Sequence, residues 1–264
     1  MVNTKNSIFL LTSIGTCLLS SAANAFTINP LPGFTDSQFN NLLISGQWNE
    51  LFVAESRGGN NALTGDQETV INPAFIPDGV GGLVPALPNP LAEGQTTWTN
   101  GTPVDFSLTY NSSSHLVTYT VGTETLSSVL ASPNPLFDPN GLYLRTRATA
   151  QDSVSSSSMV LQNLLLDDGS GFLPIGSLSS SSGSTAGDIN YLNIANLNAS
   201  FTLKGQQVLS WSGAFPTGSK LAAQIKVGGT PFVSTPEPTA WLGLTAIAAF
   251  GAGAMVKKKR TNSF

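Results

Sequence analysis

Val104-Asp105-Phe106-Ser107-Leu108-Thr109-Tyr110 alternates between apolar and polar side chains, and Val117-Thr118-Tyr119-Thr120-Val121 repeats the alternation further on. Because successive side chains of a strand point to opposite faces of a sheet, each segment has one apolar face. The residues between them, 111–115, are polar and are typical of a turn that joins antiparallel strands. This stretch therefore predicts a β-hairpin with one buried face.

Similar short segments, rich in β-branched and aromatic residues, lie on both sides of the hairpin and are separated by turn residues. We expect a second hairpin, in which strands 199–203 and 208–212 flank a turn at Lys204-Gly205-Gln206. The tight-turn dipeptide Asn100-Gly101 should close another strand. The remaining strands are expected at 46–57, 95–99, 142–150, 159–166, 188–194 and 220–227. Strands at this spacing predict an all-β domain with two packed antiparallel sheets, a β-sandwich of the jelly-roll or concanavalin-like type.

Two kinds of segment interrupt this pattern. Residues 58–103 contain six prolines and many glycines, so we expect a loop insertion that lies on the surface or folds over one sheet. The serine tracts at 155–158 and 179–182 are expected to be polar, flexible connections at a hairpin tip.

Charge and cysteine content limit the possible functions of residues 26–235. This part holds 14 of the 15 acidic residues and six of the 11 basic ones, a net charge of about −8. A body this acidic repels nucleic acid, so no nucleic-acid partner is expected. The only cysteine, Cys17, lies before this part, so neither a disulfide nor a cysteine metal site is expected in it.

Residues 1–25 have the three parts of a secretory signal peptide. Lys5 provides the positive charge, residues 8–19 the apolar core, and Ala23-Asn24-Ala25 the small-residue cleavage site. We therefore expect signal peptidase to cut between Ala25 and Phe26. An alternative is lipoprotein processing at Cys17, although Thr16 stands where a small Gly, Ala or Ser is expected.

The last residues, 236–264, combine a rigid acidic tripeptide, an apolar run and a basic cluster. Pro236-Glu237-Pro238 holds the backbone extended. Residues 239–256 carry no charge and would form a helix of roughly 27 Å, enough to cross a bilayer. Four cations then follow, and they should stay in the cytoplasm and place the body outside: Lys257, Lys258, Lys259 and Arg260. The alternatives are a plain C-terminal anchor and a buried core helix.

This order of tripeptide, apolar helix and basic end resembles the PEP-CTERM sorting signal of exported bacterial proteins, especially its cyanobacterial type. The resemblance implies that Pro236, Glu237 and Pro238 are the sorting residues. It also implies a second processing partner, a membrane peptidase of the exosortase class.

The body itself resembles the choice-of-anchor domains, particularly the W type. The resemblance rests on Glu50-Leu51-Phe52-Val53-Ala54-Glu55-Ser56-Arg57, Leu144-Arg145-Thr146-Arg147-Ala148 and Gln224-Ile225-Lys226-Val227-Gly228. It implies a bacterial surface domain and no particular reaction.

Few residues point to catalysis. His115 is the only histidine and falls in a turn, so a solvated turn residue is favoured over a Ser-His-Asp triad. Glycoside hydrolysis needs two carboxyl groups across a sugar. Glu50 and Glu55 are five residues apart and should face opposite sides of a regular strand, while Asp66 and Glu68 fall in a loop. No catalytic residue, metal ligand or cofactor is therefore predicted.

Other polar or aromatic residues have two interpretations each. Arg145 and Arg147 share one face of a strand and could clamp a carboxylate or sulfate, or pair with Glu55 or Asp105. Asp167-Asp168-Gly169 offers oxygen ligands for calcium, but turn residues are favoured because the loop spacing is wrong. The tryptophans could stack on sugars or lie in the core, and the core is favoured for Trp48, Trp98 and Trp211.

The sequence thus predicts an exported cell-surface or extracellular-matrix protein with a structural or adhesive, non-catalytic body. The alternatives are a carbohydrate-binding module that takes extracellular polysaccharide and, third, a glycoside hydrolase.

Overall fold

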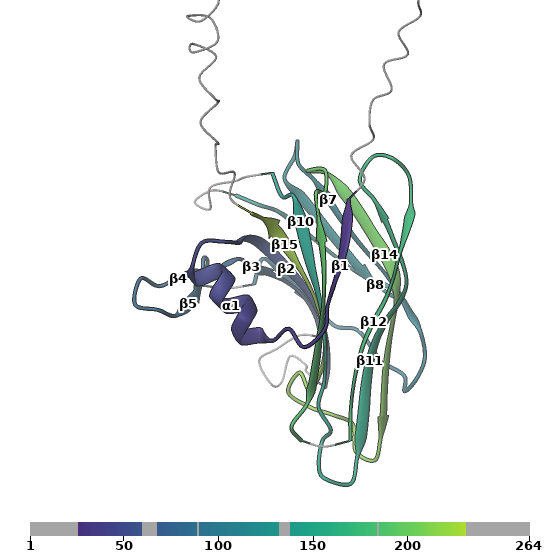
Figure 1. The fold of residues 1–264 in the computed structure, drawn as a ribbon. Helices are drawn as coiled ribbons and strands as arrows, with labels where there is room; N and C mark the ends of the chain where they lie inside the picture. The colour runs from purple at the N-terminus through teal and green to yellow at the C-terminus, as the bar shows by residue number, and fades with distance from the viewer. Residues whose placement is uncertain (1–25, 60–67, 89, 132–137, 184, 231–264) are drawn as a thin grey trace, which may run out of the picture.

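Two antiparallel sheets pack face to face in the computed structural model, which describes residues 26–59, 68–88, 90–131, 138–183 and 185–230 (Figure 1). The seven-stranded sheet has the strand order β1-β13-β10-β15-β2-β3-β6 and the six-stranded sheet the order β12-β11-β14-β7-β8-β9. A helix and a two-stranded hairpin cover part of the outer face of the seven-stranded sheet (Figure 1). The predicted all-β, antiparallel fold is confirmed.

The elements have the following bounds. The seven-stranded sheet contains β1 (Thr27–Leu31), β2 (Asn49–Gly58), β3 (Thr69–Pro73), β6 (Ala92–Gly94), β10 (Gly141–Ala148), β13 (Asp188–Ala195) and β15 (Leu221–Gly229). The six-stranded sheet contains β7 (Val104–Asn111), β8 (Leu116–Val121), β9 (Glu124–Val129), β11 (Ser156–Asp167), β12 (Leu173–Ser182) and β14 (Phe201–Ser212). The hairpin consists of β4 (Phe75–Pro77) and β5 (Leu83–Pro85), and the helix is α1 (Asp36–Ile44).

One apolar core fills the space between the sheets. Phe52 and Leu144 contribute to it from the seven-stranded sheet, and Leu108 and Leu161 from the six-stranded sheet. A few buried hydrogen bonds cross the same space. The Tyr119 hydroxyl lies 2.5 Å from Ser56 Oγ and accepts a bond of 3.0 Å from Gln207 Nε2. Burial raises the pKa of Tyr119 to about 12, so this phenol stays neutral and can donate a proton to a hydrogen bond.

The predicted hairpin at 104–121 is present as β7 and β8. Leu108 lies opposite Tyr119, and the apolar residues at 106, 108, 110, 117, 119 and 121 are buried in the core. The strands expected near 46–57, 142–150, 159–166, 188–194 and 220–227 are also present, as β2, β10, β11, β13 and β15.

The expected second hairpin is wrong, because β14 is one continuous strand. Its apolar positions stay in phase across the expected turn, and both Leu203 and Leu209 are buried. A Cβ at Gly205 would lie 2.8 Å from the Leu164 side chain and from the Gln162 carbonyl. The glycine therefore permits close packing in the strand and does not form a turn.

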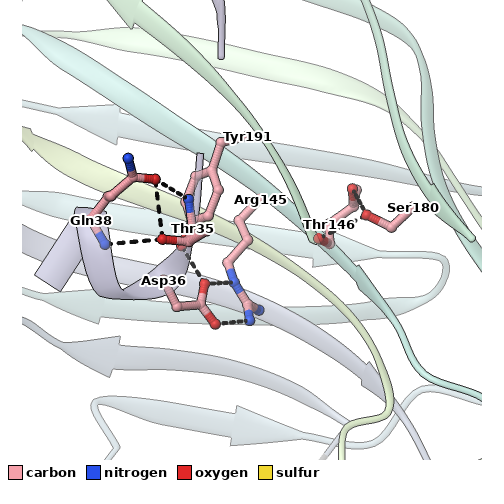
Figure 2. A network of polar contacts seen from close by, with 7 residues as sticks. All are labelled: Thr35, Asp36, Gln38, Arg145, Thr146, Ser180 and Tyr191. Carbon is pink, nitrogen blue, oxygen red and sulfur yellow. Dashed lines mark hydrogen bonds and ion pairs between the residues drawn. The ribbon is translucent and has the colours of Figure 1, made fainter. Parts of the chain in front are cut away.

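The serine tracts, apart from Ser155, are also strands and not flexible connections. Ser157 lies opposite Ser182, and Ser158 lies opposite Ser181, where β11 pairs with β12. Ser180 is buried and its hydroxyl bonds to Thr146 of the other sheet at 2.8 Å (Figure 2). Tertiary partners decide the conformation of these serines, and β propensity does not.

Residues 95–99 form no strand, although Asn100-Gly101 is a turn. The turn carries the chain from β6 in one sheet to β7 in the other, so it does not close a hairpin. The Asn100 amide accepts a hydrogen bond of 2.9 Å from the Trp211 main-chain nitrogen. Trp98 is buried just before this turn and donates a bond of 3.0 Å to the Arg57 carbonyl.

The segment 58–103 contains more sheet than expected. Strand β3 lies between β2 and β6, and Pro73 is tolerated there because it is the last residue of the strand. The β4–β5 hairpin of this segment projects from the outer face of the sheet (Figure 1).

Several predictions concern residues outside the described ranges. These are the signal peptide at 1–25, the motif Pro236-Glu237-Pro238, the helix at 239–256 and the basic cluster 257–260. Among the described residues, no helix is long and apolar enough to cross a membrane.

Candidate functional site

A groove of about 330 Å³ opens on the outer face of the seven-stranded sheet. Three neighbouring strands, β3, β2 and β15, form its floor, and the β4–β5 hairpin with the proline-rich segment after it forms its wall. This groove, called here the outer-face groove, is lined by Val53, Glu55, Arg57, Asn72, Pro73, Phe75, Pro85, Leu87, Pro88, Pro90, Gln224 and Lys226.

Strand periodicity explains the polar floor. Glu55 and Arg57 alternate along β2 with core residues, and Gln224 lies directly opposite Glu55 on β15. Asn72 of β3 donates a hydrogen bond of 3.3 Å to Glu55 Oε2. The floor therefore presents a carboxylate, a guanidinium and two amides side by side.

A β-bulge corrects the prediction for Glu50 and Glu55. The register shifts near Leu51, so Leu51 and Phe52 both face the core, and Glu50 lies on the same outer face as Glu55. The Glu50 side chain is fully buried, however, whereas Glu55 lines the groove. The two carboxylates share a face because the bulge changes the count of residues along the strand.

Glu50 is held by two neighbours, Lys226 and Phe75, beneath the wall of the groove. Its Oε1 lies 3.6 Å from Lys226 Nζ, and its Oε2 accepts a bond of 2.9 Å from the Phe75 main-chain nitrogen. The Lys226 ammonium also lies 4.6 Å from the centre of the Phe39 ring. Burial raises the pKa of Glu50 above its usual range, although Lys226 opposes this shift.

Helix α1 borders the same face and is fixed to it by an ion pair (Figure 2). Arg145 Nε and Nη2 donate to the two oxygens of Asp36 at 2.7 and 2.6 Å, and the Tyr191 hydroxyl donates to Asp36 Oδ1 at 2.6 Å. Burial alone would raise the pKa of Asp36, but the bonds from Arg145 and Tyr191 and the charge of Arg145 outweigh it and lower the pKa. Asp36 is therefore ionised at neutral pH.

The local sequence explains why the helix begins there. Thr35 accepts from the Gln38 main chain at 3.3 Å, and the Gln38 side chain accepts from the Thr35 main chain at 2.9 Å, which is a capping box. Phe39 and Leu43 follow one turn apart on the buried side. This helix was not predicted, although the Thr-x-x-Gln pattern at 35–38 was a usable signal.

The structure resolves the two interpretations of Arg145. It pairs with Asp36, which comes from the unpredicted helix, and not with Glu55 or Asp105. Asp105 lies in the other sheet and accepts a bond of 3.0 Å from Gln206. Burial by itself would lower the pKa of Arg145, but the Asp36 carboxylate raises it.

The other candidates serve local structure. His115 occupies the β7–β8 turn, with Nδ1 3.2 Å from the Tyr110 hydroxyl. Asp167 Oδ1 accepts from the main chain of Gly169 and of Gly171, both at 2.9 Å, so it stabilises a turn. The part of the chain that the structure describes contains no group of three or more His, Cys, Asp or Glu side chains that could hold a metal ion.

The tryptophans follow the core interpretation for the most part. Trp48 is buried under α1 against Tyr143, and Trp98 belongs to the core between the sheets. Trp211 is partly buried against the core and contacts Phe215, with ring centres 4.6 Å apart.

A comparison of the chain with models of known protein families gives no match, and a comparison with curated proteins finds no relative.

Proposed function

We propose that the protein is exported and that its β-sandwich is a structural or adhesive, non-catalytic domain at the cell surface or in the extracellular matrix. The observation that carries this proposal is the order of Pro236-Glu237-Pro238, an apolar run and a basic cluster at 236–260, after the last strand of the sandwich. The same proposal includes the two terminal helices and PEP-CTERM-type sorting. It also includes the choice-of-anchor likeness and the jelly-roll or concanavalin-like form of the sandwich.

The first and last strands of the sandwich are placed as an anchor at one end of the body would require. Thr27 at the start of β1 lies opposite Ala195, which lies opposite Gly141, and Gly141 in turn lies opposite Gly228 near the end of β15. Thr27 and Gly228 are thus three strands apart at one end of the sheet, roughly 14 Å. We call this end the tethered end. The opposite end, marked by Gly58, Ala148, Asp188 and Leu221, is called the distal end.

The proposed sorting can be tested by replacing Glu237 with alanine. We expect export to continue while the uncut protein stays in the membrane, because the rigid acidic tripeptide is what the peptidase recognises. Fractionation and mass spectrometry of both chain ends would measure this. The matched control is Glu93→Ala, which removes an exposed glutamate from the sandwich. Release of Glu237→Ala at the wild-type level would contradict the proposed sorting.

The second candidate function is carbohydrate binding, and the outer-face groove favours it. Amide, carboxylate and guanidinium groups on the floor suit hydroxyl groups, and the proline wall suits the apolar faces of sugar rings. A glycoside hydrolase would need a second carboxyl group open to the groove, and the Glu50 side chain is fully buried.

A further inference from the structure

The outer face of the six-stranded sheet presents matched pairs of uncharged side chains where β11 and β14 lie side by side. These side chains alternate along both strands with core residues such as Met159 and Leu209, so they point away from the core. The facing pairs are Ser158 with Ser210, Val160 with Val208, and Gln162 with Gln206. All six residues are half-buried, and the pairs span roughly 14 Å along the strands. We call these three pairs the β11–β14 ladder.

A hollow opens at each end of the β11–β14 ladder. One hollow, of about 420 Å³, is lined by Ser158, Ser210 and further serines of β11, β12 and β14. The other, of about 400 Å³, is lined by Gln206 together with Asn163 and Ser107. The valine pair lies between the two hollows. A ligand that fills both hollows is therefore elongated and follows the direction of the strands.

Both hollows contain polar groups that are available to a ligand. In the part of the chain that the structure describes, the hydroxyls of Ser158 and Ser210 bond to no other residue. In the second hollow, Gln206 Oε1 accepts bonds of 3.2 Å from Gln162 Nε2 and 3.0 Å from Asn163 Nδ2. A β-bulge, with a φ of 53° at Asn163, brings this amide to the outer face. The bonds hold the three amides in place, and fixed amides and hydroxyls of this kind suit the hydroxyl groups of a sugar.

The charges around the β11–β14 ladder favour a neutral ligand. Among the described residues that line the two hollows, the only charged ones are Lys204 and Asp105, which have opposite signs and lie in the same hollow. An anionic polymer would meet no cluster of cations there. Val160 and Val208 offer a narrow apolar strip that suits the apolar face of a sugar ring. Such a strip is much smaller than the surface that a stable dimer buries, so a second copy of the chain is disfavoured.

We propose that the β11–β14 ladder and its two hollows bind a neutral linear polysaccharide, whose chain runs along the strands. This site is on the opposite sheet from the outer-face groove. The proposal deepens the proposed adhesive function and rests on it for the place where such a polymer would be met. Binding by the purified protein does not depend on export, however, so its failure is distinguishable from a failure of sorting.

Full-length protein in a polyoxyethylene detergent, which contains no sugar, would be titrated with cellohexaose, maltohexaose and laminarihexaose in a calorimeter. We expect at least one of them to bind, with an affinity that does not change as salt rises. Ser158→Ala with Ser210→Ala should weaken binding about tenfold, because two neutral hydrogen bonds are lost. Asn163→Gly keeps the left-handed backbone conformation and removes the amide, so it should weaken binding about fivefold.

The matched control is Thr118→Ala with Ser127→Ala, which removes two hydroxyls, 3.3 Å apart, from β8 and β9 of the same sheet. Gln224→Ala is the control for the outer-face groove, and both controls should bind as the wild type does. The proposal would be overturned by no binding of any of the three hexasaccharides, by an unchanged affinity in Ser158→Ala with Ser210→Ala, or by weaker binding in Gln224→Ala. Dimerisation of the sugar-free protein that Ser158→Ala with Ser210→Ala abolishes would assign the ladder to a second copy and would also overturn it.

Discussion

The ion pair between Asp36 and Arg145 joins helix α1 to the seven-stranded sheet, and the Tyr191 hydroxyl also bonds to Asp36. The Arg145 side chain is almost fully buried, whereas that of Asp36 is 43% exposed. Removing the carboxylate would leave a guanidinium buried without its partner, which costs more than the net gain from forming an exposed pair. Loss of this one contact should therefore weaken the attachment of helix α1 to the outer face of the sheet.

Asp36→Asn should lower the free energy of unfolding by about 2 kcal/mol at pH 7, between the values for exposed and buried ion pairs. A carboxylate whose pKa is lowered by folding stabilises the fold above its ordinary pKa of 3.8. This stabilisation is lost as the pH falls through the lowered pKa. The difference in free energy of unfolding between wild type and Asp36→Asn should therefore shrink below pH 3.8. Urea unfolding at several pH values would measure it.

Glu93→Gln is the control for this change, because Glu93 is exposed on β6 and its replacement should leave stability nearly unchanged. Glu50 acts in the opposite direction, since its pKa is raised by burial and acid favours its folded form. Glu50 is present in both the wild type and Asp36→Asn, so its contribution cancels in the difference between their free energies of unfolding. A gap between wild type and Asp36→Asn that stays constant down to pH 2 would contradict the assigned role of Asp36.

At the scale of elements, strand β12 is an edge whose outer backbone groups are capped. The Ser181 main-chain nitrogen donates to Asp188 Oδ2 at 2.9 Å, and Asn190 Nδ2 donates to the Ser179 carbonyl at 2.9 Å. Both partners come from β13 in the other sheet. They close this side of the sandwich and occupy groups that could otherwise pair with a second chain.

The double replacement Asp188→Ala with Asn190→Ala should expose this edge and cause concentration-dependent association. Sedimentation velocity over a range of concentrations would measure it. The control is Thr118→Ala with Thr120→Ala, which changes two polar side chains on the outer face of β8, a central strand. If the double variant of β13 sediments as the wild type does at every concentration, side-chain capping of β12 is not what prevents association.

The sequence predicted those elements whose apolar alternation is regular, such as the β7–β8 hairpin. It failed where local composition and tertiary packing disagree. Lys204-Gly205-Gln206 has the composition of a turn, yet Gly205 is required by close packing against Leu164. The serines of β12 have low β propensity and form a strand because β11 pairs with them.

The candidate site was harder to predict than the fold, for related reasons. The outer-face groove depends on strand β3 and on the β4–β5 hairpin, which both come from a proline-rich segment that was expected to be a loop insertion. Arg145 and Arg147 were recognised as neighbours on one face. The partner of Arg145 is Asp36, which strand periodicity cannot place.

At the scale of the whole molecule, the proposal requires a body held by one end outside the cytoplasm. Val154 is 90% exposed in the connection between β10 and β11 at the distal end, and the only cysteine of the chain is Cys17 in the predicted signal peptide. A single new cysteine can therefore report the location of each part.

In a Glu237→Ala background, Val154→Cys should react with a membrane-impermeant maleimide on intact cells, whereas Ser263→Cys should react only after the membrane is opened. The parent protein, without a new cysteine, should stay unlabelled because signal peptidase removes Cys17. Protection of Val154→Cys on intact cells, or labelling of Ser263→Cys without permeabilisation, would contradict the proposed topology whatever the ligand of the groove.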